Sequence, residues 1–129
     1  MPVLVVTNNP MVVQKLSGRF ELFFDAGMDY EAVLKYVRDR VHKGAKLLSH
    51  PLSGSVKPGQ TPYKTVLLEE GGNTLDQASL QIIEDTLGMA VKMLAANGTA
   101  GIGEQADNDF KLIDYDLAKN ALDQMMQHK

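Results

Sequence analysis

The stretch Val-Leu-Val-Val-Thr-Asn-Asn-Pro, residues 3–10, decides the fold class of this 129-residue chain. Its first four residues form an unbroken apolar run, which is typical of a buried strand. Asn9 and Pro10 then make a helix start, because an Asn side chain caps free amides and proline suits the first helical position. The stretch therefore predicts a buried strand that leads directly into a helix ending near residue 16.

The same alternation of apolar runs and helix signals continues along the chain. Asp29 is placed to cap a helix that ends near Gly44, and Thr74 with Gln77 matches a capping box. Further strands are expected at residues 20–24, 47–48, 65–68 and 112–113, and further helices at 30–43, at 75–96 (the longest) and, capped by Asp116, up to 127. This order predicts one α/β domain over residues 1–129, with a layered, mainly parallel sheet of four or five strands flanked by helices.

The connection between the strands at 47–48 and 65–68 has no helical pattern. Parallel neighbours normally need a crossover of a dozen residues or more, which is usually a helix. We therefore expect the strand at 65–68 to run antiparallel, at one side of the sheet.

The composition is that of an ordinary globular domain and excludes several classes of protein. Apolar residues make up 44% of the chain and charged residues 22%, which excludes a disordered or collagen-like protein. Cysteine is absent, so disulfides and thiolate-ligated metal sites are excluded and a reducing cytoplasm is the expected location. A membrane span and a signal peptide are not expected, because no apolar run is long enough and the N-terminus lacks a basic-then-apolar order.

The most unusual stretch is residues 49–64, a long connection with three prolines, two glycines and three serines. Long connections in compact domains are usually functional or disordered, and prolines favour an ordered one. Its hydroxyls, His50, Lys57 and Lys64 make a donor-rich set that suits an anionic ligand. Residues 35–64 also carry a net charge of +6 in a chain whose total is -3, although a solvated basic helix face explains part of this block equally well.

Polar residues follow two of the expected strands. Thr7, Asn8 and Asn9 follow the first, and Ser49 and His50 follow the third. If these strands are neighbours, the two connections meet at one rim, where the first amides of a helix favour an anion. We expect residues 49–64 to lie against the turn at 7–9 and to enclose a polar pocket. The candidate ligand-binding residues are Thr7, Asn8, Asn9, Ser53, Gly54, Ser55, Lys57 and Lys64.

The centre of this connection is the place where we expect the anion itself. Gly54 lets the backbone approach a ligand closely, and the flanking Ser53 and Ser55 can turn successive amides inward as a small nest. Lys57 then supplies the countercharge. The alternative is a plain surface turn with a solvated lysine.

Several sequence motifs of known chemistry are absent. The chain has no Gly-rich phosphate motif after its first strand and no nucleophile elbow. The three histidines, His42, His50 and His128, lack metal-ligand spacing, so no metal is expected, and no cofactor is identified. Because Trp is absent and the total charge is acidic, nucleic-acid binding is not expected.

Three stretches together resemble the GrdX family: Thr7 to Pro10, His42 to Gly44, and the region from Leu47 to Leu68 around His-Pro-Leu-Ser-Gly-Ser-Val-Lys-Pro. The stretch from Asp109 to Asp114 contributes as well. The resemblance covers roughly residues 3–116 and leaves the helix after Asp116 outside it. It implies a cytoplasmic accessory protein of the glycine, sarcosine and betaine reductase systems of amino-acid-fermenting anaerobes, and it implies no catalytic residues.

Three functions remain open at this point. The first is an accessory factor that binds a small anionic ligand or a reductase component through residues 49–64. The second is a small enzyme in which His50 is the acid or base, since histidine titrates near neutral pH. The third is a scaffold that acts through its Met-rich helices. A crevice that gathers Asn8, His50, Ser55 and Lys57 would favour a ligand, whereas an apolar patch on the last helix would favour the scaffold. A homo-oligomer stays open.

Overall fold

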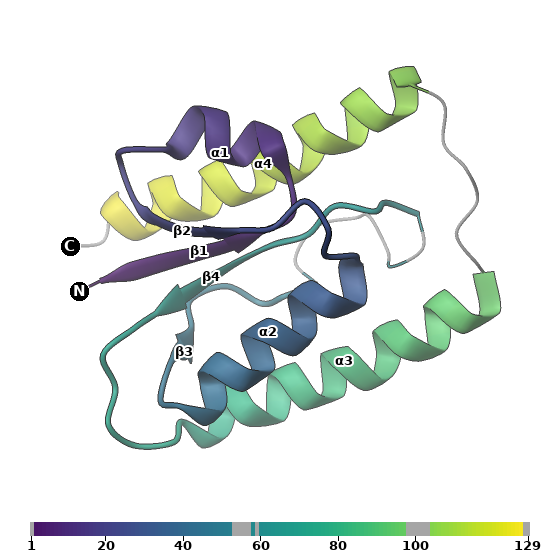
Figure 1. The fold of residues 1–129 in the computed structure, drawn as a ribbon. Coiled ribbons are helices and arrows are strands. Elements are labelled where there is room, and N and C mark those ends of the chain that lie inside the picture. The colour runs from purple at the N-terminus through teal and green to yellow at the C-terminus, as the bar shows by residue number, and fades with distance from the viewer. Residues whose placement is uncertain (1, 53–57, 59, 98–103, 128–129) are drawn as a thin grey trace.

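The computed structural model describes residues 2–52, 58, 60–97 and 104–127 and has a four-stranded mixed sheet between two helical layers (Figure 1). The elements in chain order are β1 Val3–Thr7, α1 Pro10–Leu16, β2 Glu21–Phe24, α2 Tyr30–His42, β3 Lys46–Leu47, β4 Thr65–Glu69, α3 Gln77–Asn97 and α4 Glu104–Gln127. The α/β class and the flanking helices are confirmed.

The sheet has the strand order β2-β1-β4-β3, so the expectation of a mainly parallel sheet is wrong. Only β1 and β2 pair in parallel among the described strands, whereas β4 is antiparallel to both β1 and β3. The antiparallel direction of β4 is confirmed, but β4 lies inside the sheet and not at its side. The physical reason is that the sequence of residues 49–64 has no helical pattern for a crossover, so β4 runs antiparallel beside β3 and fills the position between β3 and β1.

Each face of the sheet packs against its own pair of helices. Side chains alternate along a strand, so Leu4 and Val6 of β1 contact α2 and α3, whereas Val5 faces α1 and α4. Figure 1 shows α2 and α3 on one side of the strands and α1 and α4 on the other. The result is a three-layer sandwich in which both faces of β1 and β4 are buried.

Two of the four expected helix starts, those at Asn9 and Asp29, are confirmed. The Asn9 side chain accepts a hydrogen bond from the Met11 amide at 3.0 Å, and Asp29 accepts one from Ala32 at 2.8 Å. The third helix begins two residues later than the expected capping box at Thr74, because Asp76 accepts the amide of Ser79 at 3.1 Å. Gly44 follows α2 with a φ of 108°, which is the left-handed conformation expected of a residue just after a helix.

The C-terminal region differs most from expectation. The predicted strand at 112–113 is wrong, and Asp116 lies inside α4 instead of capping a helix. Asp114, Ala118 and Leu122 are buried at a spacing of four, which places one face of a helix against the sheet. The expected loop at 98–109 is helical from Glu104, and α4, with 24 residues, is longer than α3 with 21. The remainder of that loop lies outside the described residues.

Candidate functional site

Asn8 joins the turn after β1 to the end of the 49–64 segment. Its side-chain amide donates to the carbonyls of Pro62 at 2.9 Å and Met28 at 3.0 Å, and its oxygen accepts the amide of Lys64 at 2.9 Å. The expectation that this segment lies against the turn at 7–9 is confirmed for its last residues. The Asn8 side chain makes all of these hydrogen bonds within the protein. Its role in the structure is therefore to hold the backbone at Lys64 in place.

A buried polar cluster begins directly beside Asn8. Thr65 donates to the Asp114 carboxylate at 2.6 Å, and the Asn9 side chain donates to the same oxygen at 3.0 Å. The hydroxyl of Thr7 lies 2.8 Å from that of Thr65 and accepts the amide of Asn9. Burial raises the pKa of Asp114, and this rise is opposed by the bonds from Thr65 and Asn9 and by the charge of Lys64. The cluster thus holds a buried carboxyl group whose pKa lies above its ordinary value.

Lys64 is the unusual member of this region. It is only 8% exposed, and its amine lies 5.9 Å from the centre of the Tyr30 ring. Within the described residues this amine forms neither an ion pair nor a hydrogen bond, although Asp114 is near enough to act on it through its charge. Burial lowers the pKa of Lys64, against the opposing charge of Asp114. A lysine in this position is costly for the fold, because its charge is withdrawn from water and, among the described residues, is opposed only by the Tyr30 ring and by the more distant charge of Asp114.

Lys64 and Asp114 line a narrow pocket. Its cavity volume is about 10 Å³, which is room for about one water molecule. Its polar walls come from Lys64, Asp114, Tyr30 and Thr61. The apolar wall comes from the α4 residues Phe110, Ile113 and Leu117. The pocket is therefore on the α4 side of the 49–64 segment, and Thr7, Asn8 and Asn9, which were expected to line it, do not.

Tyr63 links the rim of this pocket to the start of α4. Its hydroxyl donates to the Asp107 carboxylate, which also pairs with Lys111 at 3.1 Å. Burial and this hydrogen bond raise the pKa of Tyr63. Tyr63 thus joins the end of the 49–64 segment to the first turns of α4, beside the pocket.

The other expected site residues are not gathered here. His50 is exposed, and its Nδ1 accepts the amide of Leu52 at 3.1 Å. The strands β1 and β3 are not neighbours as supposed, because β4 lies between them. Ser53, Gly54, Ser55 and Lys57 lie outside the described residues, so the nest around Gly54 stays a prediction.

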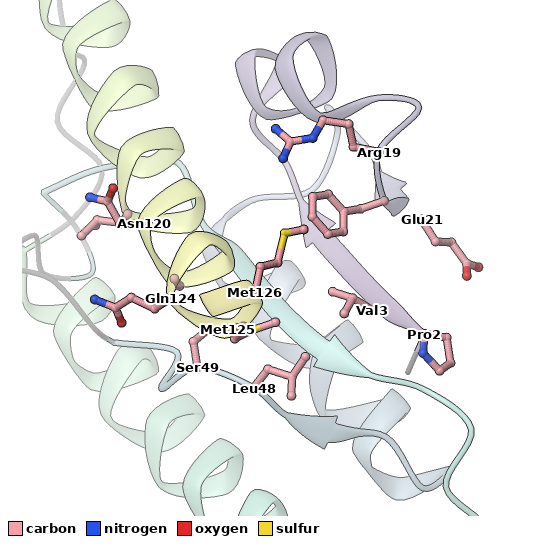
Figure 2. Close-up of a pocket in the computed structure, with 13 residues that line it drawn as sticks. Pro2, Val3, Arg19, Glu21, Leu48, Ser49, Asn120, Gln124, Met125 and Met126 are labelled. Carbon is pink, nitrogen blue, oxygen red and sulfur yellow. The ribbon is translucent and has the colours of Figure 1, made fainter. Parts of the chain in front are cut away.

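A second and much larger concavity lies under the C-terminal half of α4. This groove has a volume of about 1010 Å³ and is lined mainly by apolar atoms. Figure 2 shows Met125 and Met126 reaching from α4 toward Val3 and Leu48. Arg19 and Glu21 stand at one edge, Asn120 and Gln124 lie along α4, and Phe20 and Leu117 complete the apolar lining. Met126 is 53% exposed, so the groove presents an unbranched apolar side chain to solvent.

Two negative findings apply to the described residues. No group of three or more His, Asp or Glu side chains is arranged to hold a metal ion. No helix among them is both long and apolar enough to cross a membrane.

The comparison with protein families identifies the relatives of this chain. The family model for GrdX-like protein matches residues 4–123. The chain belongs to the GrdX-like family. The match runs well into α4, so most of this helix, which we expected to lie outside the family from Asp116 onward, falls within it. No curated protein and no solved structure matches the chain.

Sequence reasoning missed two features of this site. Asp114 was assigned to the neighbourhood of a strand, although its four-residue spacing to Ala118 and Leu122 is a helical signal. The sequence predicted only that Met-rich helices could contact a partner. It did not predict the groove, because the residues that line the groove come from distant parts of the chain.

Proposed function

We propose that this GrdX-like protein is an accessory factor of glycine, sarcosine or betaine reductase metabolism that holds a segment of a reductase component in the groove under α4. The family supports the metabolic setting. The observation that carries the docking role is the apolar groove of about 1010 Å³, which remains open beside a fully formed core. Large exposed apolar hollows of this kind mark interaction sites.

The lining favours a polypeptide with several apolar side chains. Met125 and Met126 are unbranched and can adapt to the shape of an incoming side chain, as methionines do at other docking surfaces. Arg19 and Glu21 at the edge offer one charge of each sign, which can fix the orientation of the bound segment. An amphipathic helix matches this combination of an apolar hollow and a polar edge.

The test compares two methionines of equal exposure. Met126 on α4 is 53% exposed and lines the groove, whereas Met89 on α3 is 50% exposed and lies away from it. Binding of the full chain to purified reductase components is measured by biolayer interferometry with the wild type, Met126→Asp and Met89→Asp. We expect Met126→Asp to weaken binding by at least about tenfold, the effect of losing about 1.4 kcal/mol at a hot spot. Met89→Asp should leave it unchanged. Equal binding by all three, or binding to no component, contradicts the proposal.

A second candidate function is the binding of a small anionic ligand by residues 49–64. The observation that favours it is Lys64, a buried cation without an acceptor in the described part of the chain at the anchored end of this segment. Phosphate, sulfate or acetate should then raise the melting temperature, because a ligand of the native state stabilises it. Lys57→Ala should remove this gain, and Lys92→Ala, a change on the exposed face of α3, should not. Equal gains in both variants at constant ionic strength contradict anion binding at Lys57.

His50 as a catalytic acid or base has less support. Its exposed imidazole is not among the residues that line the Lys64 pocket, and its Nδ1 accepts the amide of Leu52 in a local turn.

A further inference from the structure

Strand β2 is the longer of the two edge strands of the sheet. The strand order β2-β1-β4-β3 places β2 outside β1, and at the opposite edge β3 has only two residues (Figure 1). The outward N–H and C=O groups of an edge strand are a template for a further strand, and a very short edge strand offers few of them. Within the described sheet, β2 is therefore the edge with room for another strand.

The outward backbone groups of β2 belong to Leu22 and Phe24. The amide of Asp25 donates to the Thr7 carbonyl of β1 at 3.4 Å, and successive residues along a strand turn their backbone groups to opposite sides. The N–H and C=O groups of Leu22 and Phe24 therefore point away from β1. An antiparallel copy of β2 can form hydrogen bonds with them only if even-numbered residues lie opposite even-numbered residues.

The charges around β2 select one of the registers that this condition allows. A two-fold axis near the middle of the strand can stand at Glu21, Leu22 or Phe23. An axis at Glu21 places this carboxylate opposite itself, and an axis at Phe23 places it opposite Asp25. An axis at Leu22 places Arg19 of each copy opposite Asp25 of the other. Since like charges directly opposite one another are destabilising and unlike charges stabilise a pair of strands, the axis at Leu22 is favoured.

The side chains at this edge are available for the same register. Arg19 and Asp25 are both exposed, and neither belongs to an ion pair in the part of the chain that the structure describes. The Arg19 guanidinium lies over the Phe20 ring, 5.5 Å from its centre. Phe24 is 37% exposed, and the axis at Leu22 brings it opposite Phe20 of the second copy. Cross-strand aromatic pairs of this kind stabilise a sheet.

We propose that a second copy of this chain pairs with the first through β2, antiparallel about a two-fold axis at Leu22, so that the two sheets continue as one. A two-fold interface contains every contact twice. Each dimer therefore has two pairs of Arg19 with Asp25 and two pairs of Phe20 with Phe24. This self-association goes beyond the docking role of the groove under α4 and does not depend on it.

Two charge reversals on the full chain test the pairing by analytical ultracentrifugation. Arg19→Glu and Asp25→Lys each place like charges opposite one another in a dimer of identical chains, so each should raise the dissociation constant at least about tenfold. An equimolar mixture of the two variants should recover the wild-type affinity, because both positions then lie opposite an unlike charge. Lys92→Glu makes the same charge change as Arg19→Glu at an exposed site on α3 and should leave the dimer unchanged.

Hydrogen exchange followed by NMR locates the interface. The amides of Leu22 and Phe24 should exchange at least about tenfold more slowly in the dimer than in diluted monomer, whereas the amide of Phe23, which points to β1, should change much less. A wild type that stays monomeric overturns the proposal and leaves this edge to an extended segment of another protein. A dimer whose Leu22 and Phe24 amides stay unprotected also overturns it. A mixture of Arg19→Glu and Asp25→Lys that associates no better than either variant alone contradicts the axis at Leu22.

Discussion

The two ends of β4 show two different uses of charge. At the Glu69 end, the next residue, Glu70, accepts a hydrogen bond from the Arg40 side chain at 2.9 Å in a partly exposed position. At the Thr65 end, the preceding Lys64 is buried with no acceptor in the described part of the chain. The first arrangement ties the strand to α2 in the ordinary way. The second arrangement withdraws a cation from water, an unfavourable placement that is often found where a protein preserves a binding group.

The Glu69 end is also closed by a backbone contact. Gly44, just after α2, and Gly72, just after β4, approach so closely that a Cβ on either glycine would collide with the carbonyl oxygen of the other. A side chain at Gly44 meets a second obstacle, since its φ of 108° lies in the left-handed region. The structure at the Glu69 end therefore depends on a close backbone contact between two glycines, whereas the Thr65 end depends on hydrogen bonds to a buried carboxylate.

The largest effect is expected from Gly44→Ala. The added Cβ strains the backbone and collides with Gly72, so the free energy of unfolding should fall by about 4 kcal/mol in urea denaturation. Gly88→Ala is the matched control, because a Cβ there has no neighbour within 4 Å and α3 gains a better helix former, worth about 1 kcal/mol. A loss below 1 kcal/mol for Gly44→Ala would show that the close glycine contact is not required.

The next effect is expected from Asp114→Ala at the Thr65 end. The substitution leaves the Thr65 hydroxyl and the Asn9 amide without their acceptor and removes the charge that faces Lys64. Unfolding free energy should fall by about 3 kcal/mol. Chemical denaturation followed by far-ultraviolet circular dichroism measures it. An unchanged midpoint would mean that the polar cluster contributes nothing to the fold.

Lys64→Met is expected to act in the opposite direction. Methionine fills a similar volume without a charge, so the protein should gain about 1 kcal/mol of stability, or at least lose none. Arg40→Met at the other end should lose about 1 kcal/mol with its partner Glu70. Equal destabilisation by both substitutions would contradict the claim that the charges at the two ends of β4 differ in their effect on stability.

The smallest effect concerns pH. The pKa of Lys64 is lower in the folded chain than its ordinary value of 10.5, so the unfolded chain binds more protons between these two values. The stability that the wild type owes to this group is present above pH 10.5 and is lost as the pH falls through the folded pKa. The advantage of Lys64→Met should therefore shrink between pH 7 and pH 10 in urea titrations. A constant difference between the two proteins would show that Lys64 titrates normally.

Local signals predicted most of the first half of the fold. The apolar run at 3–6, the caps at Asn9 and Asp29 and the stop at Gly44 each act within a few residues, and each is present as expected. The strand order was not predictable from such local signals, because it depends on the pairing of β1 with strands that are far from it in the sequence, such as β4. The last helix was predicted only from Asp116 onward, and its first part, residues 104–115, was missed because the short apolar pair at 112–113 suggested a strand, whereas tertiary packing of Asp114, Ala118 and Leu122 favours one continuous helix.

The contacts of the candidate site also fall into those that the sequence predicted and those that it could not. The approach of the 49–64 segment to Asn8 followed from both stretches being polar and adjoining strands, and the bonds to Pro62 and Lys64 confirm it. Asp114 could not be placed, since its partners Thr65 and Asn9 lie 49 and 105 residues away in sequence. Candidate residues that are close in sequence were predictable, and those joined only by the finished fold were not.

The separation between Asn9 and Asp114 also has a consequence for synthesis of the protein. The two residues share a hydrogen bond across 105 positions, so the cluster requires both the first and the last secondary elements of the chain. On the ribosome, β1, α1 and β4 emerge while α4 is still inside the exit tunnel. During that interval Lys64 has neither Asp114 nor the apolar wall from α4 beside it, and it remains an ordinary hydrated lysine. The nascent chain therefore cannot present this pocket until α4 has left the ribosome and docks on the sheet.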